Sequence, residues 1–294
     1  MREFAHFAAI DWSGAKGERH PGIAIAICDA ANHNAPRLLK REHHWSRAEV
    51  LHWLRDDMPP DTLAGLDLGM SLPFADCGAF FPGWDSTPSD APSLWQLVES
   101  ICAAEPHLGA NSFVDHPRTS TYFRRHGGRE GPHFHAAGTG KRNGRFRVTE
   151  FAQATRCGCK PYSNFNLVGA AQVGKSSLTG MRLLHRLSDQ MPVWPVDPLP
   201  ASGSVIVEIY TSLAAIAAGR SASSSKMRSS GDVDQALFRL GSAPSRLRGA
   251  MSDHQADALV TAAWLRSAAT RDELWNPRGL GDVAQTEGWT FGVP

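Results

Sequence analysis

Short apolar runs that carry a carboxylate constrain the fold of this chain more than any other feature. They are residues 7–11, 63–69 and 205–210, and their carboxylates belong to Asp11, Asp67 and Glu208. Each run has the length and composition of a buried β-strand. An ionised carboxylate is costly to bury in such surroundings unless it is paired, hydrogen-bonded or bound to a metal. The pattern therefore predicts a sheet on which acidic side chains converge.

A capped helix near residue 252 supplies further candidate ligands. Ser252 and Gln255 have the S-x-x-Q spacing of a capping box, which predicts that a helix begins there. His254 and Asp257 share one face of this helix, and Asp253 lies in its first turn. The apolar remainder is expected to dock on the sheet and leave the ligands at the sheet's carboxyl edge. Alternatively, Asp253 only complements the helix dipole, and His254 and Asp257 are ordinary surface residues.

These segments resemble the ribonuclease-H-like fold and, more closely, an uncharacterised prokaryotic family described as predicted ribonuclease-H-like nucleases. The resemblance is carried by G-L-D at 65–67, S-L-P at 71–73, V-E-I-Y at 207–210, residues 253–259, and E-G-W-T-F-G at 287–292. It implies an α/β fold with a ribonuclease-H-like mixed sheet flanked by helices, and a hydrolase that cleaves phosphodiester bonds of nucleic acid. His254-x-x-Asp257 is also similar to the H-x-x-D of some Holliday-junction resolvases, although those enzymes carry Glu where this chain has Asp67.

The resemblance implies a divalent-metal mechanism whose catalytic carboxylates are Asp11, Asp67, Glu208 and Asp257. Its implied metal ligands are Asp11, Asp67, Asp253, His254 and Asp257. Two cations about 4 Å apart would be bridged by Asp11, activate a water and stabilise the leaving oxygen. Mg2+ or Mn2+ suits oxygen-rich ligands, and an imidazole favours Mn2+.

Two assignments within this set stay open. Glu208 is either a further ligand, a residue that orients a lysine or arginine, or a structural partner at a strand end. The residue that completes the site beside Asp257 is either His254 or Asp253.

Composition and cysteine usage indicate a folded protein of a reducing compartment. The chain has 294 residues and 42% hydrophobic content, which is enough to bury a sizeable core. No apolar run is long enough to span a bilayer, and the N-terminus lacks the apolar stretch of a signal peptide. The 5 cysteines are odd in number and show no disulfide framework. We therefore expect a cytoplasmic protein with no membrane partner, and the oligomeric state stays open.

Length and composition divide the chain into three parts. Residues 1–73 are expected to form the first part of the ribonuclease-H-like core, 74–200 a long insertion, and 201–294 the second part of the core. The insertion is set apart by its length and by its Pro, Gly and charge content.

A basic segment inside the insertion, residues 118–160, is the candidate nucleic-acid surface. Its basic residues greatly outnumber its acidic ones, and aromatic residues lie between them. Such a segment can neutralise phosphates and stack bases. The residues expected to contact nucleic acid are Arg124, Arg125, Lys141, Arg142, Arg145 and Arg147. Alternatively, this segment is a solvated insertion whose arginines pair with an acidic core.

One octamer matches G-x-x-x-x-G-K-S, the phosphate-binding P-loop. Its fixed positions are Gly169, Gly174, Lys175 and Ser176. A P-loop follows a buried strand, however, and residues 162–168 are polar and short. Nucleotide binding through the octamer is therefore an alternative to the nuclease hypothesis. A catalytically silent protein that binds nucleic acid through the basic segment is another.

Overall fold

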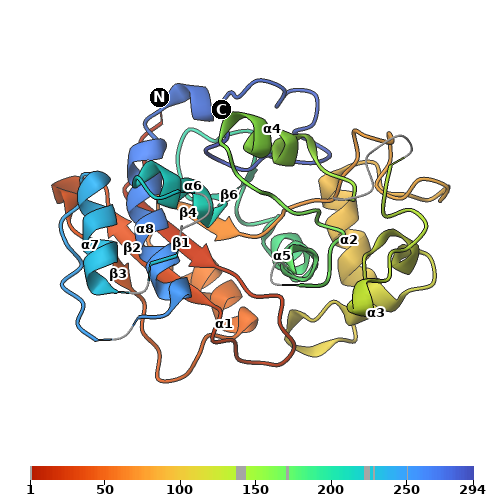
Figure 1. The fold of residues 1–294 in the computed structure, drawn as a ribbon, viewed down its shortest axis with the longest axis horizontal. Helices are drawn as coiled ribbons and strands as arrows, with labels where there is room; N and C mark the ends of the chain where they lie inside the picture. The colour runs from red at the N-terminus through yellow and green to blue at the C-terminus, as the bar shows by residue number, and fades with distance from the viewer. Residues whose placement is uncertain (1, 137–143, 170–171, 222–225, 228, 250) are drawn as a thin grey trace.

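A mixed six-stranded sheet forms the centre of the molecule (Figure 1). The computed structural model describes residues 2–136, 144–169, 172–221, 226–227, 229–249 and 251–294. The strands are β1 (His6–Asp11), β2 (Ala24–Asp29), β3 (Arg37–Leu38), β4 (Thr62–Asp67), β5 (Val193–Trp194) and β6 (Val205–Glu208), in the spatial order β3-β2-β1-β4-β6-β5. Strands β1, β4, β6 and β5 are parallel, whereas β2 is antiparallel to β1 and β3. The expected α/β class, a mixed sheet flanked by helices, is confirmed.

Helices cover both faces of this sheet. The α-helices are α1 (Arg47–His52), α2 (Ala91–Ile101), α3 (Asn111–Asp115), α4 (Val148–Arg156), α5 (Val173–Leu187), α6 (Thr211–Ala217), α7 (Ser230–Arg239) and α8 (Asp253–Ala268). A π-helical turn, η2 (Trp53–Asp57), extends α1, and the 3-10 helices are η1 (Ala31–His33), η3 (Pro106–Leu108), η4 (Thr119–Tyr122), η5 (His126–Gly128) and η6 (Asp272–Leu274). None of the described helices has the length and apolar character needed to cross a membrane.

Each face of the sheet has its own apolar core, because successive residues of a strand point to opposite faces. Ile10 and Leu66 belong to the core that includes α1, α2 and α5. Ala9 and Leu63 belong to the core that includes α6, α7 and α8. In Figure 1, α8 lies over β1 and β2 with α7 beside it, and α2 lies next to α5. Two covered faces explain why β1, β4 and β6 are apolar along almost their whole length.

The stretch expected to be an insertion is integrated with the sheet. Residues 74–200 contribute the edge strand β5, which pairs with β6. They also contribute α2 and α5, whose Trp95, Leu178 and Leu184 are buried in the same core as Ile10. The helical layer that contains α1 therefore receives α2 and α5 from this stretch.

The close packing of β4 against its neighbours is testable at Gly65. A Cβ atom there would lie 2.6 Å from Cγ2 of Ile209 and 3.0 Å from Cδ1 of Leu265. We expect Gly65→Ala to lower the free energy of unfolding by about 1–3 kcal/mol, because both side chains must shift within a packed core. Urea unfolding measures this change. The matched control is Gly281→Ala, whose Cβ would meet no atom within 4 Å; equal stability of the two variants would contradict the close packing.

Candidate active site

The pairing of β1 with β4 places two carboxylates side by side. Asp11 is the last residue of β1 and is the register partner of Asp67, the last residue of β4. Partners in parallel strands project to the same face of a sheet, and Ala9 and Leu63, which share that face with the two aspartates, pack in the core formed with α8. Both carboxylates therefore lie at the carboxyl edge of the sheet, where α/β proteins bind their ligands.

The N-terminus of α8 meets this edge because of its cap. Ser252 is the N-cap, its Oγ accepts from the Gln255 amide at 3.2 Å, and Gln255 Oε1 accepts from the Ser252 amide at 3.2 Å. The expected capping box is confirmed. It fixes the first turn of α8, on which His254 and Asp257 lie.

The structure brings His254 to the strand carboxylates and turns Asp253 elsewhere. His254 Nδ1 lies 3.1 Å from Oδ2 of Asp11. Asp253 Oδ2 lies 2.7 Å from the exposed Nζ of Lys226. Of the two residues left open as the partner of Asp257, His254 is therefore the one in contact with Asp11.

Burial and mutual repulsion shape the electrostatics of these acids. Burial is the main cause that raises the pKa of Asp67 well above its ordinary value, and the charges of Asp11 and Asp257 raise it further. Burial, followed by the charges of Asp11 and Asp253, raises the pKa of Asp257 to about 7. Burial also raises the pKa of Asp11, although the hydrogen bond from His254 opposes this rise. That bond raises the pKa of His254 in turn. Asp11, Asp67 and Asp257 thus form a group of carboxylates that repel one another.

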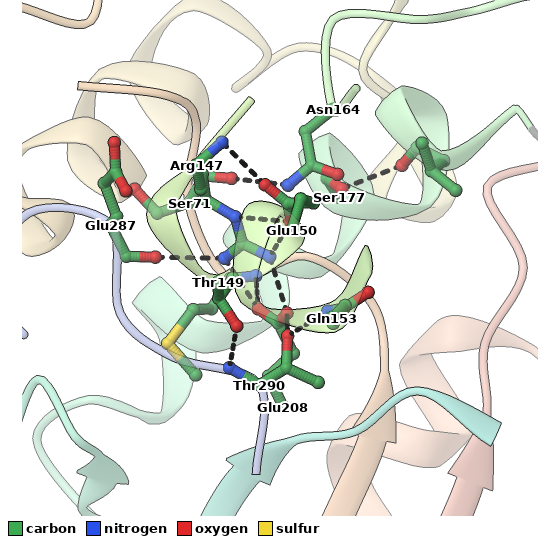
Figure 2. Close-up of polar contacts among 12 residues, drawn as sticks. Ser71, Arg147, Thr149, Glu150, Gln153, Asn164, Ser177, Glu208, Glu287 and Thr290 are labelled. Carbon is green, nitrogen blue, oxygen red and sulfur yellow. Dashed lines mark hydrogen bonds and ion pairs between the residues drawn. The ribbon is translucent and has the colours of Figure 1, made fainter. Parts of the chain in front are cut away.

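Glu208 lies at the same sheet edge but is paired with the guanidinium of Arg147 (Figure 2). Its Oε1 and Oε2 accept from Arg147 Nη2 and Nη1 at 2.6 and 2.8 Å, and Thr290 Oγ1 and the Met70 amide complete its partners. Arg147 also donates to Glu150 Oε1 from Nε and Nη2, at 2.9 and 2.6 Å. The carboxylate of Glu208 is therefore fully engaged by the protein. Of the three roles left open for it, the contacts match two: a residue that orients an arginine and a structural partner at a strand end.

Two of the arginines expected to contact nucleic acid are in the interior, which corrects that part of the hypothesis. Arg147 is 1% exposed and belongs to the cluster just described. Arg145 is also 1% exposed; it pairs with Asp76 and donates to the carbonyls of Pro73, Ala79 and Phe80. Buried guanidinium groups with these partners are not available to a phosphate backbone.

The remaining residues of the expected nucleic-acid surface differ in their surroundings from the two buried arginines. Arg124 lies 3.7 Å from Glu130, and Arg125 pairs with Asp115. Both side chains are partly exposed. Lys141 and Arg142 lie outside the described residues. Arg124 and Arg125 therefore match the alternative interpretation, in which arginines of this segment pair with acids of the same chain.

The octamer that matches a P-loop does not follow a strand of the sheet. The residues just before it form an isolated bridge between Arg124 and Asn166, and Gly169 has a φ of 86°. Lys175 and Ser176 lie in the first turn of α5, where Ser176 Oγ donates to the Val173 carbonyl. Residues 170–171 are outside the described part of the chain. The strand that a P-loop requires is thus replaced by irregular chain.

The donor set at the carboxyl edge suits a hard divalent cation in its chemistry. Among the described residues, no group of three or more His, Cys, Asp or Glu side chains is arranged so as to hold a metal ion. Asp11, Asp67 and Asp257 nevertheless supply carboxylate oxygens, and His254 supplies an imidazole. A divalent cation relieves the repulsion that raises the pKa values of such acids.

Comparisons of the chain with family models, with curated proteins and with solved structures give no match in any of the three.

Three contacts at the site have no signal in the sequence. Asp67 Oδ2 accepts from Thr211 Oγ1 at 3.4 Å, Arg147 pairs with Glu208, and Lys226 pairs with Asp253. The partners are far apart along the chain, and no spacing rule connects them. Only Glu208, an acid in an apolar strand, indicated that a cationic partner was needed.

The buried ion cluster predicts a large effect of removing its cation. We expect Arg147→Met to lower the free energy of unfolding by about 3–5 kcal/mol, because Glu150 and Glu208 then stay buried without a cation. Urea unfolding at pH 7 measures this loss. The control Arg186→Met removes a partly exposed arginine that pairs with Glu99, and its cost is expected to be at most about 1 kcal/mol.

A second substitution tests the electrostatic cause. Adding Glu150→Gln to Arg147→Met is expected to restore part of the lost stability, because one of the two stranded charges disappears. No recovery in the double variant would assign the loss to packing.

The raised pKa of Asp257 predicts a pH-dependent penalty. The folded pKa is about 7 against a reference of 3.8, so the folded state holds its proton longer and stability is lost as pH rises between these values. Without divalent metal, Asp257→Asn is expected to be more stable than the wild type by roughly 4 kcal/mol at pH 8 and equal to it near pH 4. Urea unfolding across this range measures the difference. The exposed Asp282→Asn is the control, and a constant difference at all pH values would contradict the raised pKa.

Proposed function

We propose that this protein is a metal-dependent nuclease with a ribonuclease-H-like arrangement of sheet and helices, in which Mg2+ or Mn2+ is held by carboxylates at the sheet edge. The observation that carries the proposal is the contrast between two sets of acids on one edge. Glu208 is paired with the guanidinium of Arg147, whereas Asp11, Asp67 and Asp257 repel one another and have raised pKa values. A cluster of this kind, at the carboxyl ends of adjacent parallel strands, is typical of a functional site.

Asp11, Asp67 and Asp257 would hold the metal, with His254 beside Asp11. When bound, the metal activates a water and stabilises the leaving oxygen of a phosphodiester. The hydrogen bond between His254 Nδ1 and Asp11 Oδ2 orients that carboxylate. Thr211 Oγ1 performs the same task for Asp67.

A cavity beside Asp67 offers room for part of a substrate. Its volume is about 160 Å³, and its lining includes Trp12, Tyr162, Ser176 and Tyr210. Tyr162 is 52% exposed, which is unusual for a large aromatic side chain in this protein. Aromatic faces beside a phosphodiester site favour stacking of a nucleobase. This feature supports nucleic acid as the substrate class.

Cleavage of defined nucleic acids tests the proposed function. Single-stranded, duplex and branched DNA and RNA are incubated with the protein in Mg2+ or Mn2+. Hydrolysis is expected with either metal and not in EDTA. We expect Asp11→Asn and Asp67→Asn each to reduce kcat by at least about 100-fold, because each removes a metal-binding carboxylate.

The controls separate this site from contamination and from loss of folding. The exposed Asp282→Asn is expected to retain the wild-type rate. Mn2+ is expected to raise the Tm of the wild type but not that of Asp67→Asn. Activity that survives both active-site substitutions would overturn the assignment, and nucleic-acid binding without cleavage would favour the catalytically silent alternative.

A further inference from the structure

A second cavity lies beside the candidate active site, where the loop after β1 meets the start of α5. Its volume is about 170 Å³. Its lining includes residues 14–17 of the loop, Arg47 of α1, Glu105, and Lys175 and Thr179 of α5. We call it the Lys175 cavity. Its lining includes Lys175, the lysine of the P-loop-like octamer, and the proposed function assigns no role to this lysine.

Gly14 holds this cavity next to the carboxylates. A Cβ atom at Gly14 would overlap the backbone of Lys175 and Ser176, so only glycine lets the loop approach α5 this closely. Gly14 follows Asp11 by three residues. A chain of that length spans at most about 11 Å, so the cavity is near the site proposed for the metal.

The charge of the lining is positive. Lys16 is exposed and Lys175 is partly buried, and neither has an ion-pair partner among the described residues. Glu105 is the only acid among the lining residues given for this cavity, and its carboxylate accepts from the backbone amides of Asn111 and Ser112. The carboxylate of Glu105 is therefore engaged by these two amides.

Arg47 is the strongest sign that an anion belongs here. The side chain is 1% exposed, and its Nε and Nη1 donate to the carbonyls of His107, Ser13 and Ala15 at 2.8–3.0 Å. Within the described part of the chain, Nη2 has no hydrogen-bond partner and the guanidinium has no carboxylate partner. Burial, followed by the charge of Arg182, lowers the pKa of Arg47 to about 10, so it stays charged at neutral pH. A buried cation without a counter-charge is costly, and an anion in the cavity would compensate it.

We propose that the Lys175 cavity is a phosphate-binding subsite that uses Arg47, Lys175 and Lys16. A guanidinium and two lysine side chains that line one small cavity suit a tetrahedral phosphate group, whether a singly charged phosphodiester or free inorganic phosphate. This assignment rests on the proposed function: the bound phosphate belongs to the nucleic-acid backbone and flanks the scissile bond. With a rise of about 3.4 Å per nucleotide, a span of at most about 11 Å places it within roughly three nucleotides of the cleaved linkage.

Titration with inorganic phosphate in EDTA tests the subsite without any cleavage. Calorimetry at low ionic strength is expected to show phosphate binding by the wild-type chain. We expect Lys175→Ala to weaken it by about tenfold, because a charge-assisted hydrogen bond is lost, and Lys16→Ala to weaken it less. The control Arg55→Ala is expected to bind like the wild type, since Arg55 lies before the amino end of β4. No binding by the wild type, or equal binding by Lys175→Ala, would overturn the subsite.

A second titration distinguishes the two sources of phosphate. A fluorescein-labelled single-stranded oligonucleotide and ATP are compared in the Asp67→Asn background, with and without Lys175→Ala. Oligonucleotide binding is measured at several salt concentrations, and log K is plotted against the logarithm of the salt concentration. The magnitude of the slope is expected to decrease by about 0.7 when Lys175 is replaced by alanine. ATP is expected to bind no more tightly than inorganic phosphate. Preferential ATP binding that depends on Lys175, or an unchanged slope, would overturn the nucleic-acid assignment. The phosphate titration stands apart from the cleavage assay, so failure of the nuclease proposal and failure of the subsite are separate results.

Discussion

The buried guanidinium of Arg147 is the interaction on which the arrangement of the sheet edge depends. It joins α4 through Glu150, β6 through Glu208 and the C-terminal segment through the Glu287 carbonyl. The carboxylate of Glu287 in turn accepts from the amides of Val148 and Phe74. Segments separated by more than a hundred residues are therefore tied together at one point. Breaking such a buried pair is expensive, because the charges left behind have no water to solvate them.

This cluster also sorts the acids of the molecule by role. The carboxylate oxygens of Glu208 accept hydrogen bonds from Arg147, Thr290 and the Met70 amide. Among the described residues, Asp11 is hydrogen-bonded to His254 and Asp67 to Thr211, and the charge of a third acid, Asp257, acts on Asp67. Asp11, Asp67 and Asp257 thus have no arginine comparable to Arg147 among the described residues. The proposed metal site and the cationic Lys175 cavity are complementary to the two kinds of charge that a metal-bound phosphodiester presents.

Much of the local structure was predictable because it depends on neighbours in sequence. The capping box at Ser252 follows from the S-x-x-Q spacing, and the strands that end in Asp11 and Asp67 follow from short apolar runs. The basic segment shows where such inference stops. Clustered charge suggested a surface, but Arg145 and Arg147 are buried, because each found acceptors on distant segments that composition does not reveal.

By itself the sequence determined the α/β class, the acids at the strand ends and the helix that carries His254 and Asp257, because hydrophobic period and capping act over a few residues. Tertiary structure alone decided which of these acids meet. The parallel register of β1 and β4 aligned Asp11 with Asp67, and Arg147 removed Glu208 from the group. The packing of α8 on the sheet also places His254, and not Asp253, in contact with Asp11. These outcomes depend on long-range packing and on the cost of burying unpaired charge, which no local pattern records.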